Sequence, residues 1–314
     1  MPVFGIRKPE RSVVLRTGAY GIVTNISGKV MIIKNKLGKF LPGGGLNPGE
    51  GYEEALRREF LEETGYEITI KRRLETMSWY IDTPAEWNLQ VFNTGIFYEV
   101  ELEKRVHADI EEGHEVLFID GESATDMHSD AQMWAIYKYI LSEQYPPIIK
   151  TNISAAQDRI YPLRLAARCI VQTEGDKIIL LKSEKLDICG LPGGGILRGE
   201  DIRAAAMREA KEETGRSIDQ LKPLGASIEF SSMLQLTYYF TAVATAALHG
   251  VHLTELESDW GIYPIEVDIA TAEEMIAQSK GIIMHEGFEV ASMSRARNLA
   301  ALKAYKLSDR SAAP

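Results

Sequence analysis

Three glutamates with helical spacing are the residues best suited to do chemistry. Glu59, Glu62 and Glu63 stand at i, i+3 and i+4 within the segment 52–64. That spacing places three carboxylates on one face of a helix, where like charges repel one another. A hard divalent cation above that face removes the repulsion, because Mg²⁺ prefers oxygen ligands and keeps waters and phosphate oxygens as its other ligands. The pattern therefore predicts a metal site that binds a phosphorylated substrate.

The residues around these glutamates indicate the elements that must position them. The glycines Gly43–Gly45 precede the predicted helix and are typical of a loop that approaches a ligand closely. Apolar residues recur at helical spacing between positions 55 and 61, and Gly65 follows as the C-cap. Arg58 and Glu50 carry opposite charges, and we expect them to pair and to fix the loop against the helix.

The same pattern occurs a second time, 150 residues later. An ungapped comparison of 41–66 with 191–216 gives 14 identities in 26 positions. One charge run of this kind is usually a solvated helix face. Here the glutamates, the arginine and the glycines recur together, and this favours a functional site over a solvated face. The second set of charged residues is Glu200, Arg208, Glu209, Glu212 and Glu213.

The repeat predicts two domains, in agreement with a length of 314 residues. Amphipathic helices are predicted at 130–141 and 291–307, at the far end of each half. Pro146 and Pro147 follow the first of these helices and indicate a linker. Strands and a glycine-rich segment precede each acidic helix, and further strands follow it, so we expect a mixed sheet flanked by helices in each half. The predicted domains are 1–147 and 158–314.

Composition and charge exclude several classes of protein. Hydrophobic residues make up 45% and charged residues 25%, as in an ordinary globular protein and not in a disordered, collagen-like or coiled-coil chain. The net charge of −10, without a basic helix-turn-helix segment, gives no general attraction to nucleic acid or anionic lipid. We see no secretory signal and no segment that spans a bilayer, and Cys169 and Cys189 fit two reduced thiols. We therefore expect a cytoplasmic protein without a DNA-binding appendage.

Both segments resemble the signature of the Nudix hydrolase family, G-x5-E-x7-R-E-U-x-E-E-x-G-U, in which U is a bulky aliphatic residue. The first copy consists of Gly44, Glu50, Arg58, Glu59, Phe60, Glu62, Glu63, Gly65 and Tyr66. The second consists of Gly194, Glu200, Arg208, Glu209, Ala210, Glu212, Glu213, Gly215 and Arg216. Both copies hold every polar and glycine position, and the departures at Tyr66, Ala210 and Arg216 concern packing.

The resemblance implies an α+β protein with two Nudix domains, each an α/β/α sandwich around a mixed β-sheet. It also implies that water cleaves the pyrophosphate of a nucleoside diphosphate linked to a group X, with Mg²⁺ or Mn²⁺ bound. The implied metal ligands are Gly44, Glu59, Glu62 and Glu63 in the first copy and Gly194, Glu209, Glu212 and Glu213 in the second. Glu59 and Glu209 are implied to be catalytic as well, with Arg58 and Arg208 orienting the catalytic helices. The substrate-binding glycines are Gly43, Gly45, Gly193 and Gly195.

A carboxylate outside the signature often serves as the base in this family. In the first half, Glu112 is the predicted catalytic residue of this kind, with Glu115 as an alternative in the same loop. In the second half, Glu255 and Glu257 precede the next predicted strand and are candidates too.

Alternatives of a different class remain open. One is a nucleotide-sensing protein on a Nudix scaffold, which the loss of the glutamates would mark. Another is one active domain with a structural pseudo-domain. The substrate is a nucleotide-type small molecule, and a nucleoside triphosphate, an oxidised nucleotide, a nucleotide sugar or a dinucleoside polyphosphate fits equally. Because duplicated domains often retain an ancestral two-fold interface, we expect a pseudo-dimeric monomer.

Overall fold

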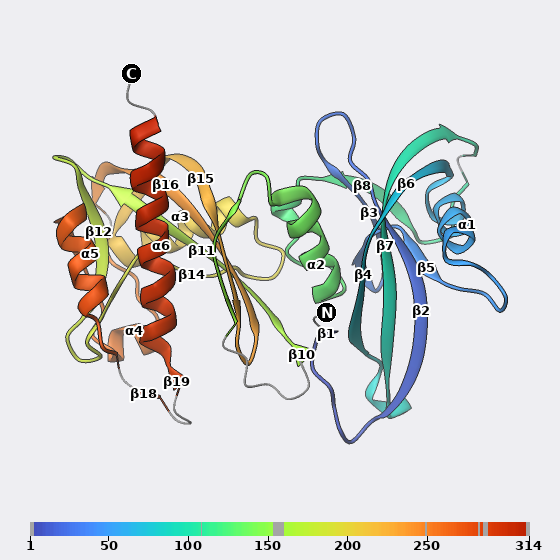
Figure 1. The fold of residues 1–314 in the computed structure, drawn as a ribbon, viewed down its shortest axis with the longest axis horizontal. Coiled ribbons are helices and arrows are strands. Elements are labelled where there is room, and N and C mark those ends of the chain that lie inside the picture. Colours follow the sequence, from blue (N-terminus) through green and yellow to red (C-terminus); the bar gives the residue numbers. More distant parts are fainter. Residues whose placement is uncertain are drawn as a thin grey trace. The chain divides into compact units, whose positions relative to one another are not determined.

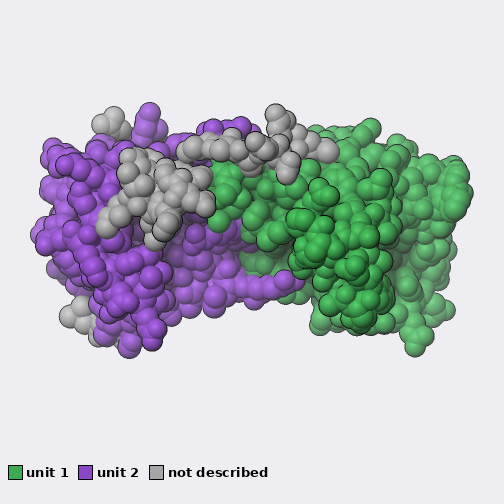
Figure 2. All heavy atoms as spheres, turned by 90° about the horizontal axis from the view of Figure 1, so that it is seen from below, with its two compact units in different colours: residues 1–142, 153–163, 230–234 green, residues 143–152, 164–229, 235–314 purple. Residues whose placement is uncertain are grey.

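The computed structural model describes residues 3–107, 109–152, 160–248, 250–281, 283–284 and 288–311. The chain divides into two compact units, coloured separately in Figure 2. Unit 1 comprises Met1–Ser142, Ile153–Leu163 and Phe230–Leu234. Unit 2 comprises Glu143–Asn152, Arg164–Glu229 and Gln235–Pro314.

The main sheet of unit 1 contains six strands in the order β10-β1-β6-β7-β2-β5. Its centre is a long antiparallel pair, β6 with β7, and β2 runs parallel to β7. The bounds are β1 (Val3–Phe4), β2 (Ser12–Ile22), β5 (Gly43–Gly45), β6 (Tyr66–Asp82), β7 (Leu89–Arg105) and β10 (Ile160–Tyr161). A smaller sheet has the order β4-β3-β8, with β3 (Val30–Asn35), β4 (Gly38–Phe40) and β8 (Glu115–Ile119).

Helices cover the main sheet of unit 1, and Figure 1 shows α1 and α2 on opposite sides of it. Leu56 and Phe60 of α1 are fully buried against a core that includes Ala19 and Ile96 of the sheet. This burial of apolar area holds the acidic helix in place. The helical segments are α1 (Tyr52–Thr64), η1 (Ala85–Trp87), η2 (Gly121–Ser123), α2 (Asp130–Ile136) and the π-helical turn η3 (Tyr137–Leu141).

Unit 2 contains one larger sheet in the order β13-β12-β11-β16-β15-β9, with β14 paired to β11 and β17 paired to β12. Its strands are β9 (Pro147–Asn152), β11 (Leu163–Gln172), β12 (Lys177–Ser183), β13 (Ile188–Gly190), β14 (Gly193–Gly195), β15 (Arg216–Phe230), β16 (Leu234–Leu248) and β17 (Tyr263–Asp268). A short antiparallel pair joins β18 (Ile283–Met284) to β19 (Phe288–Glu289).

The helices of unit 2 are α3 (Ile202–Thr214), α4 (Glu255–Asp259), α5 (Ile269–Gln278) and α6 (Val290–Ser311). Figure 1 shows α5 beside α6, and both contribute to one apolar core with β11, β12 and β16. Cys169 and Cys189 are buried and free, as predicted. No helix in the described part of the chain combines the length and the apolar character needed to cross a bilayer.

The two units repeat one order of elements, since β2-β5-α1-β6-β7 corresponds to β11-β14-α3-β15-β16. The acidic helices and the α+β class are as predicted. The glycine runs differ from the prediction, because they form short strands, β5 and β14, that pair antiparallel with β2 and β11. Their lack of side chains permits this, since a Cβ atom at Gly43 would lie only 2.2 Å from the carbonyl oxygen of Ala19.

Two further segments differ from the predicted elements. The helix expected at 130–141 is α-helical only over Asp130–Ile136 and continues as the π-helical turn η3. Strand β9 (Pro147–Asn152) belongs to unit 2, although Pro147 ends the predicted first domain and residues 148–152 fall between the two predicted domains.

Candidate functional site

Local interactions define both ends of the acidic helix α1. The backbone N–H of Gly51 donates to the Glu54 carboxylate at 2.8 Å, which closes the N-terminal turn. Gly65 adopts the left-handed conformation at the C-terminus, with φ 74°, as the sequence predicted. Because both ends are fixed, the phase of the helix determines that Glu59 and Glu63 lie toward the glycine strand β5.

The guanidinium group of Arg58 connects this helix to the preceding loop. It donates two hydrogen bonds to Glu50, at 2.8 and 2.9 Å, and one to the carbonyl oxygen of Gly45, at 3.0 Å. Its Nη1 atom also donates to Glu59 at 2.9 Å and to Glu62 at 3.1 Å. The predicted pair of Arg58 with Glu50 is therefore present, and the same arginine orients two of the three glutamates.

The third glutamate is held by the backbone. The N–H of Gly43 donates to Oε2 of Glu63 at 2.8 Å, and the Glu63 residue is only 9% exposed. Burial, reinforced by the charges of Glu59, Glu111 and Glu62, raises the pKa of Glu63 to about 8. Gly44 lies directly against the neighbouring carboxylate, since a Cβ atom there would be 2.5 Å from Cδ of Glu59.

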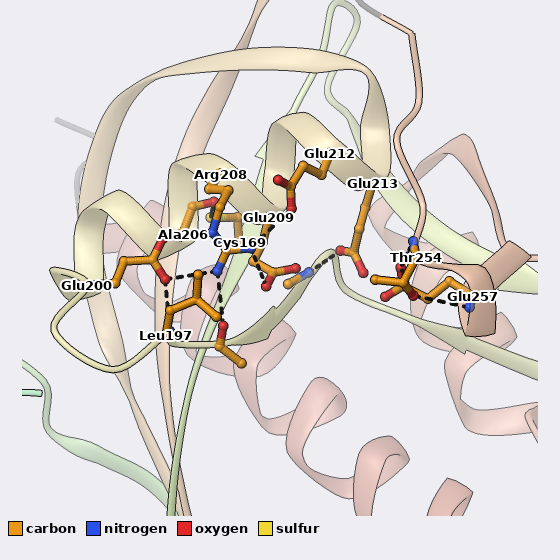
Figure 3. Close-up of polar contacts among 12 residues, drawn as sticks. Cys169, Leu197, Glu200, Ala206, Arg208, Glu209, Glu212, Glu213, Thr254 and Glu257 are labelled. Carbon is orange, nitrogen blue, oxygen red and sulfur yellow. Dashed lines mark hydrogen bonds and ion pairs between the residues drawn. The ribbon is translucent and has the colours of Figure 1, made fainter. Parts of the chain in front are cut away.

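Unit 2 repeats this network (Figure 3). Arg208 donates to Glu200 at 2.7 and 2.9 Å and to the carbonyl oxygen of Gly195 at 3.1 Å. It also donates to Glu209 at 2.8 Å and to Glu212 at 3.1 Å. The N–H of Gly193 donates to Glu213 at 2.5 Å, and burial raises the pKa of Glu213 to about 7. The predicted residues of each signature thus come together within their own unit.

In each unit a loop docks on the C-terminal turn of the acidic helix. The N–H of Glu111 donates to the carbonyl oxygen of Glu62 at 2.9 Å in unit 1, and the N–H of His252 donates to that of Glu212 at 2.7 Å in unit 2. Figure 3 shows Glu257 on the side of Glu213, where its carboxylate accepts the N–H of Thr254 at 2.8 Å. His252 also lines a pocket of about 460 Å³ between this loop, α4 and the start of β17.

These loops carry the glutamates that could serve as the catalytic base outside the signature. Glu111 acts on Glu63 electrostatically, and Glu257 acts on both Glu209 and Glu213. Glu112 and Glu115 are exposed, and Glu115 forms an ion pair with Lys34 at 3.5 Å. Glu111 belongs to the same acidic run, but its position was not predictable from the sequence, because only the path of the loop places its charge near Glu63. The catalytic role of Glu112 stays a prediction.

The donor set fits a hard divalent cation, although its side chains are turned toward partners within the protein. Among the described residues no three acidic, histidine or cysteine side chains form a ready-made metal cluster. Arg58 holds Glu59 and Glu62, while Glu63 faces the N–H of Gly43. Burial also raises the pKa of Glu59, so a proton or a cation is favoured beside these buried carboxylates. Oxygen donors of this kind suit Mg²⁺ or Mn²⁺.

The variant Glu50→Gln is expected to reduce turnover about tenfold or more, because it releases the arginine that orients Glu59 and Glu62. The hydrogen bond from Arg58 lowers the pKa of Glu50 to about 2. Since this pKa lies below the usual value of 4.5, the pair stabilises the fold above pH 4.5 and loses its effect as the pH falls toward 2. Urea unfolding should therefore separate the variant from the unmodified protein more at pH 7 than at pH 3. An equal difference at both pH values contradicts this linkage.

Comparison with known proteins agrees with this geometry. The model of the NUDIX domain matches residues 14–141 and 162–266, one segment in each half of the sequence. The chain belongs to the Nudix family. Its two acidic helices with their glycine strands fall within the matched segments, and the α+β fold with mixed sheets is the one that the resemblance implied.

Individual Nudix relatives match over shorter stretches. "Putative 8-oxo-dGTP diphosphatase" of Bacillus subtilis is 44% identical over 59 residues, which are 18% of this chain and 40% of that protein. "Putative nudix hydrolase 1" of Caenorhabditis elegans is 32% identical over 80 residues, 24% of this chain and 22% of that protein. The chain thus spans less than half the length of these relatives. A solved structure, a NUDIX hydrolase from Nitrosomonas europaea, has 16% identity and a TM-score of 0.35, covering 46% of this chain and 89% of its own.

Proposed function

We propose that each unit hydrolyses the pyrophosphate bond of a nucleoside diphosphate linked to a group X, with Mg²⁺ or Mn²⁺ bound. The observation that carries this proposal is the duplicated network around Arg58 and Arg208. Corresponding hydrogen bonds of these arginines to their four acceptor residues agree within 0.1 Å between the units. A merely solvated acidic helix has no reason to repeat such a geometry.

The residues of unit 1 would have separate roles in this reaction. Glu59, Glu62 and Glu63, with the carbonyl oxygen of Gly44, would hold the cation, which neutralises phosphate charge and lowers the pKa of a water. Arg58 keeps two of these carboxylates in place. The glycine strand presents backbone without side chains, so the pyrophosphate can approach closely. A loop carboxylate, Glu111 or Glu112, would accept the proton of the attacking water.

The corresponding set in unit 2 is complete as well. Glu209, Glu212, Glu213 and the carbonyl oxygen of Gly194 would hold the second cation, Arg208 would orient them, and Glu257 is the loop carboxylate that acts on Glu213. Loss of the glutamates was the expected mark of a sensing protein, and both copies retain all of them. We therefore propose that both units are active. The cytoplasmic location and the pseudo-dimeric monomer stay predictions.

Removal of divalent metal is expected to abolish turnover. Without a cation, the buried carboxylates repel the phosphate groups and nothing offsets the charge that develops during cleavage. The measurement is phosphate or nucleotide release with Mg²⁺, with excess chelator, and after Mg²⁺ is restored. The last arm controls for damage by the chelator, and full turnover in excess chelator refutes the mechanism.

The substrate is best sought among nucleoside triphosphates first. The Bacillus subtilis relative carries 8-oxo-dGTP in its name, and its matched stretch is 44% identical. We propose that oxidised and ordinary nucleoside triphosphates belong to the substrate class, with nucleotide sugars and dinucleoside polyphosphates as the other members to test. A panel of these compounds with Mg²⁺ decides this, and failure of every member to react refutes hydrolysis.

A further inference from the structure

Unit 2 contains a cluster of buried and partly buried polar side chains outside the proposed metal ligands. Arg168 on β11 stands opposite Gly193 in the strand pairing, and its Nη1 atom donates to the carbonyl oxygen of Leu191 at 2.6 Å. Arg297 on α6 donates to Glu229 on β15 at 3.1 Å. Arg168 and Arg297 act on each other electrostatically, so the two cations share one region behind the glycine strand.

Both arginines have a donor without an acceptor. Within the described part of the chain, the Nε atoms of Arg168 and Arg297 are buried and have no hydrogen-bond partner. Leaving a buried charged donor unsatisfied is costly, so native proteins rarely tolerate one without a purpose. The hydroxyl groups of Tyr239 and Ser227, from fully buried residues, supply further donors to the same region.

The cluster also carries uncompensated charge. Glu229 is 1% exposed and neutralises one of the two arginines. The next acid, Glu213, accepts the N–H of Gly193 and belongs to the proposed metal site. Burial, followed by the charge of Arg297, lowers the pKa of Arg168, and the charge of Glu213 opposes this shift. An arginine fork in such surroundings is suited to a carboxylate or a phosphate.

Unit 1 differs at the corresponding position. Tyr20 stands opposite Gly43 there, as Arg168 stands opposite Gly193. The Tyr20 ring packs against Trp79 and Phe97, each with a centroid distance of 5.5 Å. The residue opposite the first glycine of the strand is therefore aromatic in unit 1 and cationic in unit 2, although the signature glutamates of the two units are the same.

We propose that Arg168 and Arg297 form a pocket in unit 2 for an oxyanion, a carboxylate or a phosphate, carried by the group X of its substrate. The position behind Gly193 places this pocket next to the proposed metal site. The Arg297 side chain, on α6, is 11% exposed. The proposal rests on the proposed function of unit 2, and it predicts that the two units prefer different groups X.

The test compares three probes that differ only beyond the diphosphate: uridine diphosphate glucose, uridine diphosphate glucuronate and uridine triphosphate. Guanosine diphosphate mannose, its mannuronate and guanosine triphosphate repeat the comparison with another base. Binding is measured by calorimetry with Ca²⁺ in place of Mg²⁺, and hydrolysis is measured separately with Mg²⁺. The variants are Arg168→Gln and Arg297→Gln. The matched control is Lys222→Gln, which removes an exposed cation from β15, the strand that carries Glu229.

The intact protein is expected to bind one of the two anionic probes about tenfold or more tightly than the neutral sugar, as a charge-assisted hydrogen bond implies. A preference for the uronate identifies a carboxylate, and a preference for the triphosphate identifies a phosphate. Arg168→Gln should abolish the preference without weakening the binding of the neutral probe, and Lys222→Gln should retain the preference. If Arg168→Gln does not fold, Arg297→Gln must show the same loss.

The pocket is overturned by equal affinity of the intact protein for all three probes in both series. It is also overturned if the folded variant loses affinity equally for every probe. A preference that survives in both variants overturns it as well. Binding is measured with Ca²⁺, separately from hydrolysis. The proposed pocket and the proposed function can therefore fail independently. A preference without hydrolysis refutes only the proposed function, whereas hydrolysis without a preference refutes only the pocket.

Discussion

The double variant Glu63→Gln, Glu213→Gln is expected to lose at least about 10²-fold in Mg²⁺-dependent turnover, as removal of one key electrostatic group typically does. Each glutamine keeps the size of the side chain and an oxygen that can accept the N–H of Gly43 or Gly193. Each removes one buried anion that would face the cation. The loss should therefore appear in turnover and not in folding, which circular dichroism and thermal unfolding check.

The single variants show how the activity is divided. If both units act on one substrate, Glu63→Gln and Glu213→Gln each retain part of the turnover. Glu53→Gln is the matched control, because Glu53 lies exposed on the same helix as Glu63. If either single variant alone abolishes all turnover of a substrate, the claim that both units hydrolyse that substrate is wrong. The panel of group X compounds then shows whether the remaining unit prefers another substrate.

The variant Gly193→Ala is expected to destabilise unit 2 by about 3 kcal/mol or more. Gly193 has φ 137°, a conformation that alanine rarely adopts. A Cβ atom there would lie 2.2 Å from the carbonyl oxygen of Ala167 and 2.6 Å from Cα of Arg168. Both neighbours are backbone atoms of β11, so neither can move aside cheaply. Activity of unit 2 should fall too, because the N–H of Gly193 holds Glu213.

Gly195→Ala is the matched control for stability, two residues along the same strand. A Cβ atom at Gly195 meets no atom within 4 Å, and its φ lies outside the left-handed region. Thermal and urea unfolding should therefore place Gly195→Ala within about 1 kcal/mol of the unmodified protein. Equal stability of the Gly193 and Gly195 variants contradicts the close approach of β14 to β11.

Local patterns were predictable from the sequence. The acidic helix follows from apolar spacing and a C-terminal glycine, and the pair of Arg58 with Glu50 follows from their charges at the start of that helix. The duplication added the decisive information, because an accidental charge run does not recur with its glycines. The helix and the pair of Arg58 with Glu50 depend on residues that are close in the sequence, where backbone geometry fixes which side chains meet.

Features that depend on distant residues were not predictable. The glycine strands exist because β2 and β11 lie alongside them, and nothing within Gly43–Gly45 itself indicates pairing. The charge of Glu111 reaches Glu63 through a loop that docks on α1. In the sequence, Arg168 is typical of a solvated strand residue. Only the fold brings Arg297, on α6 near the end of the chain, close enough to act on it electrostatically. Sequence spacing alone carries no measure of such distances.

The arginine network makes each site rigid before any ligand arrives. Arg58 donates to Glu50, Glu59, Glu62 and the carbonyl oxygen of Gly45, so the fold itself fixes the rotamers of two long acidic side chains. Ordering such side chains at the moment of binding would cost conformational entropy for each one. Under the proposed function, folding has already ordered them, so more of the interaction with a pyrophosphate would remain available to stabilise the transition state. We therefore expect the two signature arginines to connect the stability of the acidic helices to the rate of hydrolysis.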